Sequence, residues 1–352
     1  MMKIKNFKFK DLKIVEKFKY SVAIALVVVL TGLVLMLIPS VGMKVGIDFA
    51  GGAIVKVDLG DYASTHQEAR EEAKNQIMEE VKANGFTISL DRWSGDNSTV
   101  LELSLSLELN GKKIDSKDDK AQDEYRAKIE GTLENNFNDG LKSKIESKLY
   151  DLDLGFELDD DWYEHDFVGA SAINLLNNAI WATAVAVVAM LIYIVIRFTI
   201  SSGLASVICL MHDVFVMFAF TTIFRIQVNT TFVVAVITII GYSINASIVI
   251  FDRIREIRKL DSMKDKSDME VANKAVNDTL SRTLLTTITT LAAIAILAIV
   301  CAIMGVTTME EFALPIVFGL IAGAFSSVLL APSLWVYFRK LGAKIKKQKK
   351  VK

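Results

Sequence analysis

Ionisable and amide side chains occur inside long apolar stretches of this sequence, where they could bind or carry an ion. His212 and Asp213 interrupt the apolar run CLMHDVFVM, Asn245 lies within GYSINASIVIF, and Arg282 lies within TLSRTLLTTITTL. A charge at membrane depth costs about 2.5–3.5 kcal/mol, so such groups usually face other helices or a water-filled cavity. We therefore expect an ion-coupling or polar membrane lining whose candidate residues are Asp213, Asn245, Arg282, Thr238, Thr286 and Thr289.

Helical spacing places Asn245 on a polar stripe. Thr238, Gly241 and Asp252 lie seven residues before, four before and seven after Asn245, so all four share one face of a helix. The neighbouring serines fall off this stripe: Ser243 and Ser247. We expect the stripe to face a partner or another helix rather than lipid.

A second polar face follows Arg282 in the next apolar stretch. Thr286 and Thr289 lie four and seven residues after Arg282, on the same side of a helix. For the threonines alone we favour packing, as interhelical hydrogen bonds of about 0.6–2 kcal/mol each. For Arg282 and Asp213 the cost of a lone charge favours a functional role or a buried partner.

Six stretches are long and apolar enough to cross a bilayer, whose core takes roughly 20 helical residues. The first could be a cleaved signal peptide, but it is long for one and lacks a small-x-small cleavage site. Gly319 and Gly323 in the last stretch form a small-xxx-small spacing that lets helices pack closely. The predicted spans are residues 21–38, 172–196, 203–224, 230–251, 283–304 and 312–337.

Charge is strongly segregated along the chain. Residues 41–165 carry 28 acidic and 15 basic side chains, while the rest of the chain carries 13 acidic and 25 basic ones. Because basic loops stay in the cytoplasm, we expect both termini inside and the acidic region outside. The predicted organisation is a basic cytoplasmic N-terminus (1–20), transmembrane helix 1 (21–40), an extracytoplasmic domain (41–168), transmembrane helices 2–6 (169–338) and a basic cytoplasmic tail (339–352).

The acidic region has the alternation and turn residues of a folded α+β domain. Its order is β-α-β-β-α-β, the ferredoxin-like arrangement, which many unrelated functions share. We predict strands and helices at residues 53–59, 65–84, 86–93, 99–109, 119–149 and 151–167. The fold class is therefore a polytopic α-helical membrane protein with a ferredoxin-like domain between helices 1 and 2.

Little in the sequence indicates a metal site or an enzyme. Cys209 and Cys301 lie in apolar runs without metal-ligand spacing, and the acidic run 159–161 is typical of a solvated surface. There is no HExxH motif, phosphate-binding glycine loop or G-x-S-x-G elbow. We expect no cofactor, no metal, no nucleic-acid partner and no enzymatic activity.

Five motifs together resemble the SecD/SecF family of the Sec protein-export machinery, within the resistance-nodulation-division superfamily. They are VGIDFAGG (45–52), HDV (212–214), GYSIN with FDRIRE (241–256), TLSRTLLTTITTL (279–291) and FGLIAGAFSSVLLAP (318–332). The resemblance covers nearly the whole chain and is to the SecF side of the family, unfused to SecD. The motif residues that carry over are Asp48, Phe49, Gly51, Gly52, Gly241, Asp252, Arg253, Arg255 and Glu256.

The resemblance implies a multi-pass protein of the cytoplasmic membrane of a bacterium or archaeon. Such a subunit would pair with a SecD-like subunit, attach to the SecYEG channel and use a proton or sodium gradient to promote translocation of unfolded preproteins. The family's fifth-span arginine carries over to Arg282. The aspartate that commonly follows the fourth-span asparagine does not, because Ala246 follows Asn245.

This substitution leaves two main hypotheses for the function. In the first, the chain is an ion-coupled export subunit whose Asn245 and Arg282 line a pathway carried mainly by SecD. In the second, it is a structural or docking subunit with no ion-coupling role of its own. A small-molecule exporter of the same superfamily is a third alternative, although such exporters generally need a second six-span half.

Overall fold

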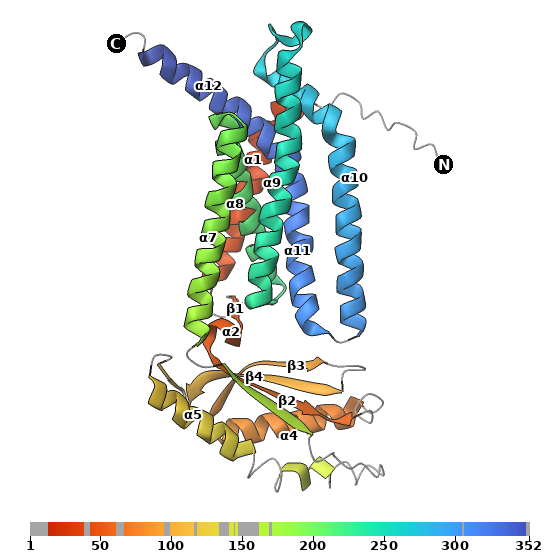
Figure 1. Cartoon of the computed structure of the whole chain (residues 1–352). Helices are drawn as coiled ribbons and strands as arrows, with labels where there is room; N and C mark the ends of the chain where they lie inside the picture. The colour runs from red at the N-terminus through yellow and green to blue at the C-terminus, as the bar shows by residue number, and fades with distance from the viewer. Residues whose placement is uncertain are drawn as a thin grey trace.

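The computed structural model describes residues 13–38, 43–60, 67–94, 99–115, 118–133, 141–143, 145–146, 162–168, 171–304 and 306–349. A bundle of long helices stands on a smaller α+β domain, which we call the sheet domain (Figure 1). Six helices in the described residues are long and apolar enough to cross a membrane, and the sheet domain lies between the first and second. The predicted fold class is confirmed.

The apolar stretches form the helix bundle. Its helices are α1 (Phe18–Leu37), α7 (Ser171–Arg197), α8 (Ile200–Ile223), α9 (Thr230–Lys259), α10 (Asp268–Ile303), α11 (Thr307–Phe325) and α12 (Ala331–Lys349). Short helical turns lie at Val15–Lys17 and Asp261–Met263. The sixth predicted span is not one regular helix, because the π-helical turn Ser326–Leu330 separates α11 from α12.

Side-chain caps set the starts of three of these helices. The N-cap residues of α8, α9 and α10 are Thr199, Asn229 and Ser267, and each side-chain oxygen accepts a hydrogen bond from a backbone N–H of the first turn. Such caps satisfy amide groups that have no partner inside the helix, and each contributes about 1 kcal/mol. Polar residues between apolar runs therefore decide where the spans begin.

The sheet domain has the predicted ferredoxin-like order. Its main strands follow the order β3-β4-β2-β6, every neighbouring pair is antiparallel, and the short β5 pairs with β4. Residues 61–66 and most of 134–161 lie outside the described part of the chain, including the acidic run 159–161. The elements are β2 (Gly52–Asp58), α4 (Gln67–Ala83), β3 (Phe86–Ser94), β4 (Val100–Leu109), β5 (Lys112–Lys113), α5 (Asp119–Thr132) and β6 (Tyr163–Val168).

The core of the sheet domain lies between the sheet and its two helices. Alternate residues of β2 and β4, such as Val55 and Leu103, are buried against Ile77 of α4 and Tyr125 of α5. Helices α4 and α5 lie on the face of the sheet away from the bundle (Figure 1). The opposite face is therefore turned toward the membrane-spanning helices.

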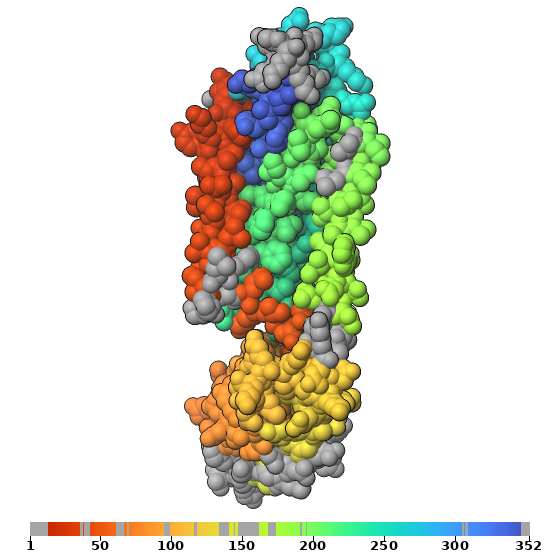
Figure 2. All heavy atoms as spheres, turned by 90° about the vertical axis from the view of Figure 1, so that its left-hand side faces the viewer, coloured from red at the N-terminus to blue at the C-terminus, as the bar shows by residue number. Residues whose placement is uncertain are grey.

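The sheet domain and the bundle are separate lobes that meet at a narrow junction (Figure 2). Gly52, the first residue of β2, is the register partner of Val168, the last residue of β6. The chain thus enters and leaves the sheet domain at adjacent points. The start of α1 and the end of α12 both lie at the end of the bundle away from the sheet domain (Figure 1).

Candidate functional site

Asp213 is a fully buried carboxylate in the middle of the helix bundle. Its side chain is 0% exposed, and its Oδ2 atom accepts hydrogen bonds from Ser243 Oγ at 2.5 Å and Ser326 Oγ at 2.8 Å. Its Oδ1 atom lies 2.9 Å from His212 Nδ1. Three segments of the bundle, α8, α9 and the π-helical turn, therefore meet at one ionisable group.

The π-helical turn, an irregular stretch of helical backbone, supplies one of the hydrogen-bond partners of Asp213. Ser326 is its first residue, and the hydroxyl of Ser326 contacts Asp213 while its carbonyl lies 3.8 Å from Cys209 Sγ. Single π-turns inside long helices are rare and are frequently found at functional sites. The turn thus places the Ser326 hydroxyl on the buried carboxylate.

The sequence-predicted stripe on α9 lies elsewhere. Thr238 and Asn245 are exposed on the surface of the bundle, whereas Ser243 and Ser247, which fall off the stripe, are buried at 2% and 1% exposure. The structure therefore does not bring Asn245 to Asp213. It divides the polar residues of α9 between a buried face and an open face.

Arg282 and its threonines form a second open face on α10. The side chains of Arg282, Thr286 and Thr289 are exposed in this chain. The Thr286 hydroxyl donates to the Arg282 carbonyl at 2.9 Å, and the Thr289 hydroxyl donates to the Leu285 carbonyl at 3.0 Å. Among the described residues these two hydroxyls donate to their own helix, and a role in linking helices stays a prediction.

A hydrogen bond between α9 and α10 lies beside the two open faces. Tyr242 Oη donates to Thr287 Oγ1 at 2.9 Å, and Tyr242 sits between Thr238 and Asn245 in sequence. A methyl group added at Gly241, next to Tyr242, would meet no atom within 4 Å. The backbone of α9 is therefore open to close approach by another helix at this point.

Gly319 and Gly323 of α11 pack against the buried face of α9. A Cβ atom at Gly319 would lie 2.5 Å from Ile239 Cγ1, and one at Gly323 would lie 3.6 Å from Asp213 Oδ2 and 3.8 Å from Ser243 Cβ. The absence of a side chain at Gly319 lets α11 approach α9 closely, whereas a Cβ at Gly323 would make only ordinary van der Waals contacts beside the buried carboxylate.

The GIDFAGG motif forms the junction between the bundle and the sheet domain. Strand β1 (Lys44–Val45) pairs in parallel with β7 (Gln227–Val228), just before α9. The following short helix α2 (Ile47–Ala50) places Asp48 Oδ2 3.0 Å from the backbone N–H of Thr230, in the first turn of α9. Phe49 is buried in the core of the bundle.

The two glycines of the motif turn the chain into the sheet. Gly51 has φ +74° and Gly52 has φ +145°, conformations that side chains strongly disfavour. A Cβ at Gly52 would also lie only 2.0 Å from the Leu105 carbonyl oxygen of β4. Glycine is required at position 52 because the backbone of β4 passes within contact distance of it.

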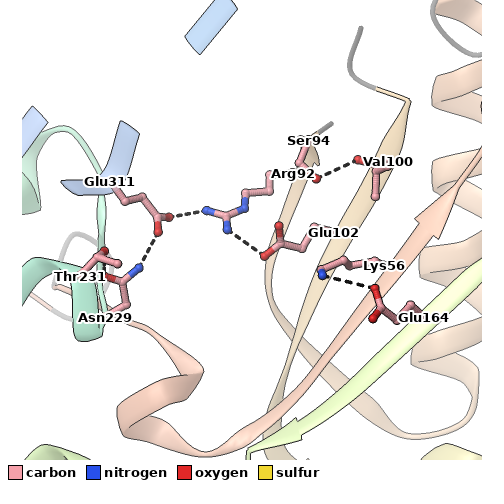
Figure 3. Close-up of polar contacts among 9 residues, drawn as sticks. All are labelled: Lys56, Arg92, Ser94, Val100, Glu102, Glu164, Asn229, Thr231 and Glu311. Atoms are coloured by element: carbon pink, nitrogen blue, oxygen red, sulfur yellow. Dashed lines mark hydrogen bonds and ion pairs between the residues drawn. The ribbon is translucent and has the colours of Figure 1, made fainter. Parts of the chain in front are cut away.

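A row of alternating charges crosses the face of the sheet that is turned toward the bundle (Figure 3). Arg92, Glu102, Lys56 and Glu164 are register neighbours on β3, β4, β2 and β6. Arg92 Nη2 lies 2.8 Å from Glu102 Oε1, and Lys56 Nζ lies 3.4 Å from Glu164 Oε2. Opposite charges directly across strands stabilise a sheet.

Glu311 continues this row into the bundle. It lies near the start of α11, and Arg92 Nη1 donates a short hydrogen bond to its Oε1 atom (Figure 3). Its Oε2 atom accepts from Asn229 Nδ2 at 2.6 Å, and the same Asn229 caps α9. Although burial lowers the pKa of Arg92, the hydrogen bonds and charges of Glu102 and Glu311 raise it overall.

The charged end of α9 links three helices. Asp252 pairs with Arg197 of α7 at 3.5 Å, and Arg253 pairs with Asp278 of α10 at 2.7 Å. Arg253 also pairs with Glu256 one turn further along α9. The DRIRE motif residues therefore fix how the ends of α7, α9 and α10 are arranged.

Sequence reasoning missed several of these residues. Ser326, Glu311, Asn229 and Arg92 were not predicted as site residues. A polar residue inside an apolar run was the available signal for Ser326, and a polar residue directly before a span was the signal for Asn229 and Glu311. Nothing local in the sequence marks Arg92, the arginine of the predicted strand 86–93, as a site residue.

Comparison with known proteins identifies the family. The profile of the family described as "Protein export membrane protein SecD/SecF, C-terminal" matches residues 155–341, more than half of the chain. The chain belongs to the SecD/SecF family. Its motifs from HDV onward fall within the matched region, whereas GIDFAGG precedes it.

Similar SecF and SecDF proteins cover different shares of the chain. The protein translocase subunit SecF of Helicobacter pylori is 28% identical over 330 residues, which is 93% of this chain and 88% of that protein. SecF of Sebaldella termitidis is 38% identical over 187 residues, which is 53% of this chain and 58% of that protein. SecDF of Bacillus subtilis is 34% identical over 173 residues, which is 49% of this chain and 23% of that protein.

Solved SecDF structures share the fold. The crystal structure of SecDF from Thermus thermophilus, a translocon-associated membrane protein, superposes with a TM-score of 0.67 at 24% identity. SecDF in a super-membrane-facing form superposes with a TM-score of 0.59 at 22% identity. The chain is covered at 97% and 99% but spans only 40% and 41% of those SecDF chains.

Proposed function

We propose that this SecD/SecF family member acts as the SecF subunit of the Sec translocase. In this role it pairs with a SecD-like subunit beside the SecYEG channel and uses a proton or sodium gradient to promote preprotein translocation. The sheet domain lies on the extracytoplasmic side, where it engages the unfolded preprotein, and both termini are cytoplasmic. The protein is a transport subunit and not an enzyme.

The observation that carries the proposal is the open polar surface of α9 and α10 at membrane depth. Asn245 and Arg282 are exposed in this chain, and neither side chain has a hydrogen-bond partner among the described residues. Arg282 directly precedes the predicted span 283–304, and an arginine left uncovered at the edge of the lipid favours a partner subunit that covers it. The backbone of α9 is open at Gly241, and the threonine hydroxyls beside Arg282 bond to carbonyls of their own helix. Both features suit close packing of a second helix bundle.

The buried Asp213 is the group we assign to ion binding within this chain. It is ionisable, lies at the meeting point of three segments, and has hydroxyl and imidazole neighbours that can adjust to a change in its charge. Ala246, where the family commonly has aspartate, supplies no such group. Asn245 and Arg282 then serve as polar lining toward the partner.

The orientation follows from the positions of the basic residues relative to the sheet domain. The basic ends of α9 and α12 lie at the end of the bundle away from the sheet domain (Figure 1). By the positive-inside rule this end belongs in the cytoplasm. Reactivity of single cysteines introduced at Lys344 and Lys113 toward a membrane-impermeant thiol reagent in whole cells tests this: only the second is expected to react.

Replacing Arg282 by alanine tests the proposal. In cells whose copy of the chain carries Arg282→Ala, we expect export of a reporter preprotein to slow by about fivefold or more, the scale of a coupling lost between two sites. Ser281→Ala, at an exposed neighbouring position on α10, is the matched control and should leave export unchanged. Export at the normal rate with Arg282→Ala would overturn the proposal.

The alternative of a purely structural subunit is distinguished at Asn245. If the open face lines an ion pathway, Asn245→Leu weakens the dependence of export on the membrane gradient, while co-purification with a SecD-like protein persists. If the face only docks the partner, gradient dependence stays normal. Ala246→Asp, which restores the residue common in the family, should be tolerated or change the rate only mildly.

A further inference from the structure

A basic cavity lies at the end of the helix bundle away from the sheet domain. It has a volume of about 370 Å³ and lies among the ends of α7, α8, α9 and α12. Five cationic side chains line it, and no acidic residue does within the described part of the chain: Arg197, Arg255, Arg258, Lys259 and Arg339.

Neighbouring carboxylates neutralise only part of this charge. Asp252 pairs with Arg197 at 3.5 Å, and Asp268 is shared by Arg258 and by Arg339, whose Nε lies 3.2 Å away. Arg255 and Lys259 are exposed. Five cations with two adjacent carboxylates leave an excess positive charge that an anion would balance.

Hydrogen-bond donors at the cavity are not all used within the protein. The Nε atom of Arg258 is buried and has no hydrogen-bond partner in the described residues. The N-terminus of α8 also reaches the cavity, where the hydroxyls of Thr199 and Ser202 share one hydrogen bond of 3.1 Å, so that one of the two hydroxyls remains able to donate to a ligand. The positive end of a helix and clustered guanidinium groups both favour phosphate oxygens.

The rest of the cavity wall is apolar and aromatic. Phe198, Phe251, Ile254 and Trp335 line it, and the Arg339 guanidinium lies over the Trp335 ring at 5.2 Å. Tryptophan is enriched at the interface between lipid and water, where an apolar ring meets a polar head. The cavity is thus amphiphilic, with cations and an apolar wall side by side at the end of membrane-spanning helices.

We propose that this cavity binds the phosphate headgroup of an anionic phospholipid in the adjoining leaflet. The cations and the α8 N-terminus take the phosphate, and the aromatic wall takes the glycerol and the first part of the acyl chains. Basic pockets between transmembrane helices at a membrane surface suit such headgroups. Because α7, α8, α9 and α12 all contribute, a bound lipid would hold the ends of these four helices together.

Titration of the purified full chain in non-ionic detergent tests this proposal. Dioctanoyl phosphatidylglycerol is added to the labelled protein, and binding is measured by microscale thermophoresis, with dioctanoyl phosphatidylcholine and inorganic phosphate as separate arms. We expect the anionic lipid to bind about tenfold or more tightly than either alternative. Equal binding of the two lipids would overturn the charge argument, and equal binding of inorganic phosphate would assign the site to a free phosphate.

A pair of double variants separates the cavity from general surface charge. Arg255→Gln with Lys259→Gln removes two exposed lining cations, and Lys264→Gln with Lys274→Gln removes two exposed cations at the same end of the bundle outside the cavity. We expect the first pair to weaken lipid binding about tenfold and the second to change it less than about twofold. Equal losses in both pairs would overturn the proposal.

Discussion

Arg92 and Glu311, which are 219 residues apart in the chain, form an ion pair that joins the sheet domain to the helix bundle. Their side chains are only 18% and 11% exposed, so solvent screens the pair little. Glu102 holds the other end of the Arg92 guanidinium, and Asn229 holds the other oxygen of Glu311. The capping residue of α9 is therefore connected through Glu311 and Arg92 to Glu102 of the inner strand β4.

Removing this pair should loosen the sheet domain from the bundle. We expect Arg92→Gln and Glu311→Gln each to destabilise the full chain, and their effects to be non-additive by about 1–3 kcal/mol, as for residues in one network. The double-mutant cycle is measured by urea unfolding in detergent. Lys56→Gln with Glu164→Gln, the more exposed pair in the same row, serves as the control and should show a coupling below about 1 kcal/mol. Additive effects of Arg92→Gln and Glu311→Gln would contradict the finding.

Gly52 should be intolerant of any side chain. Gly52→Ala places a Cβ against the Leu105 carbonyl in a disfavoured backbone conformation, so we expect a loss of about 3 kcal/mol or more in the free energy of unfolding of the sheet domain. Gly60→Ala is the matched control, because Gly60 also has a positive φ but open space around it. It should cost about 1 kcal/mol. The free energies of unfolding are measured from Trp fluorescence during urea unfolding. Equal losses of stability for Gly52→Ala and Gly60→Ala would show that the contact with β4 is unimportant.

Two substitutions at Asp213 separate its structural role from its charge. Asparagine can still accept from Ser243 and Ser326, so Asp213→Asn should preserve folding while slowing gradient-dependent export. Leucine accepts nothing and leaves buried hydroxyls unpaired, so Asp213→Leu should also destabilise the chain by about 2–4 kcal/mol. Thermal unfolding in detergent and reporter export in cells provide the two readouts. Export at the normal rate with Asp213→Asn would show that Asp213 has no role in ion coupling.

Much of the architecture could be predicted from periodicity. The first five apolar runs correspond to single helices, and the sixth corresponds to α11 and α12 with the π-helical turn between them. The fourth predicted span begins at the residue where α9 begins, because Asn229 caps it. The alternation in residues 86–93 and 99–109 correctly gave β3 and β4. Hydropathy and alternation succeed here because each depends only on neighbours in the sequence.

The candidate site was harder to predict from the sequence, because it depends on contacts between segments that are distant in the chain. The spacing on α9 correctly grouped Thr238 with Asn245, but spacing alone cannot say which face of a helix is buried. The serine that reaches Asp213 is Ser243, on the other face, and its companion Ser326 is positioned by a π-helical turn. Such turns have no reliable sequence pattern, so the clustering of these groups emerged only in three dimensions.

The adjacent entry and exit of the sheet domain have a mechanical consequence. A body attached through neighbouring strand ends at Gly52 and Val168 can turn about that single pivot, because neither attachment opposes rotation. The ion pair between Arg92 and Glu311 adds a second anchoring point and so removes this freedom. A load pulling on the sheet domain would exert a torque on α11 through Glu311 until the pair breaks.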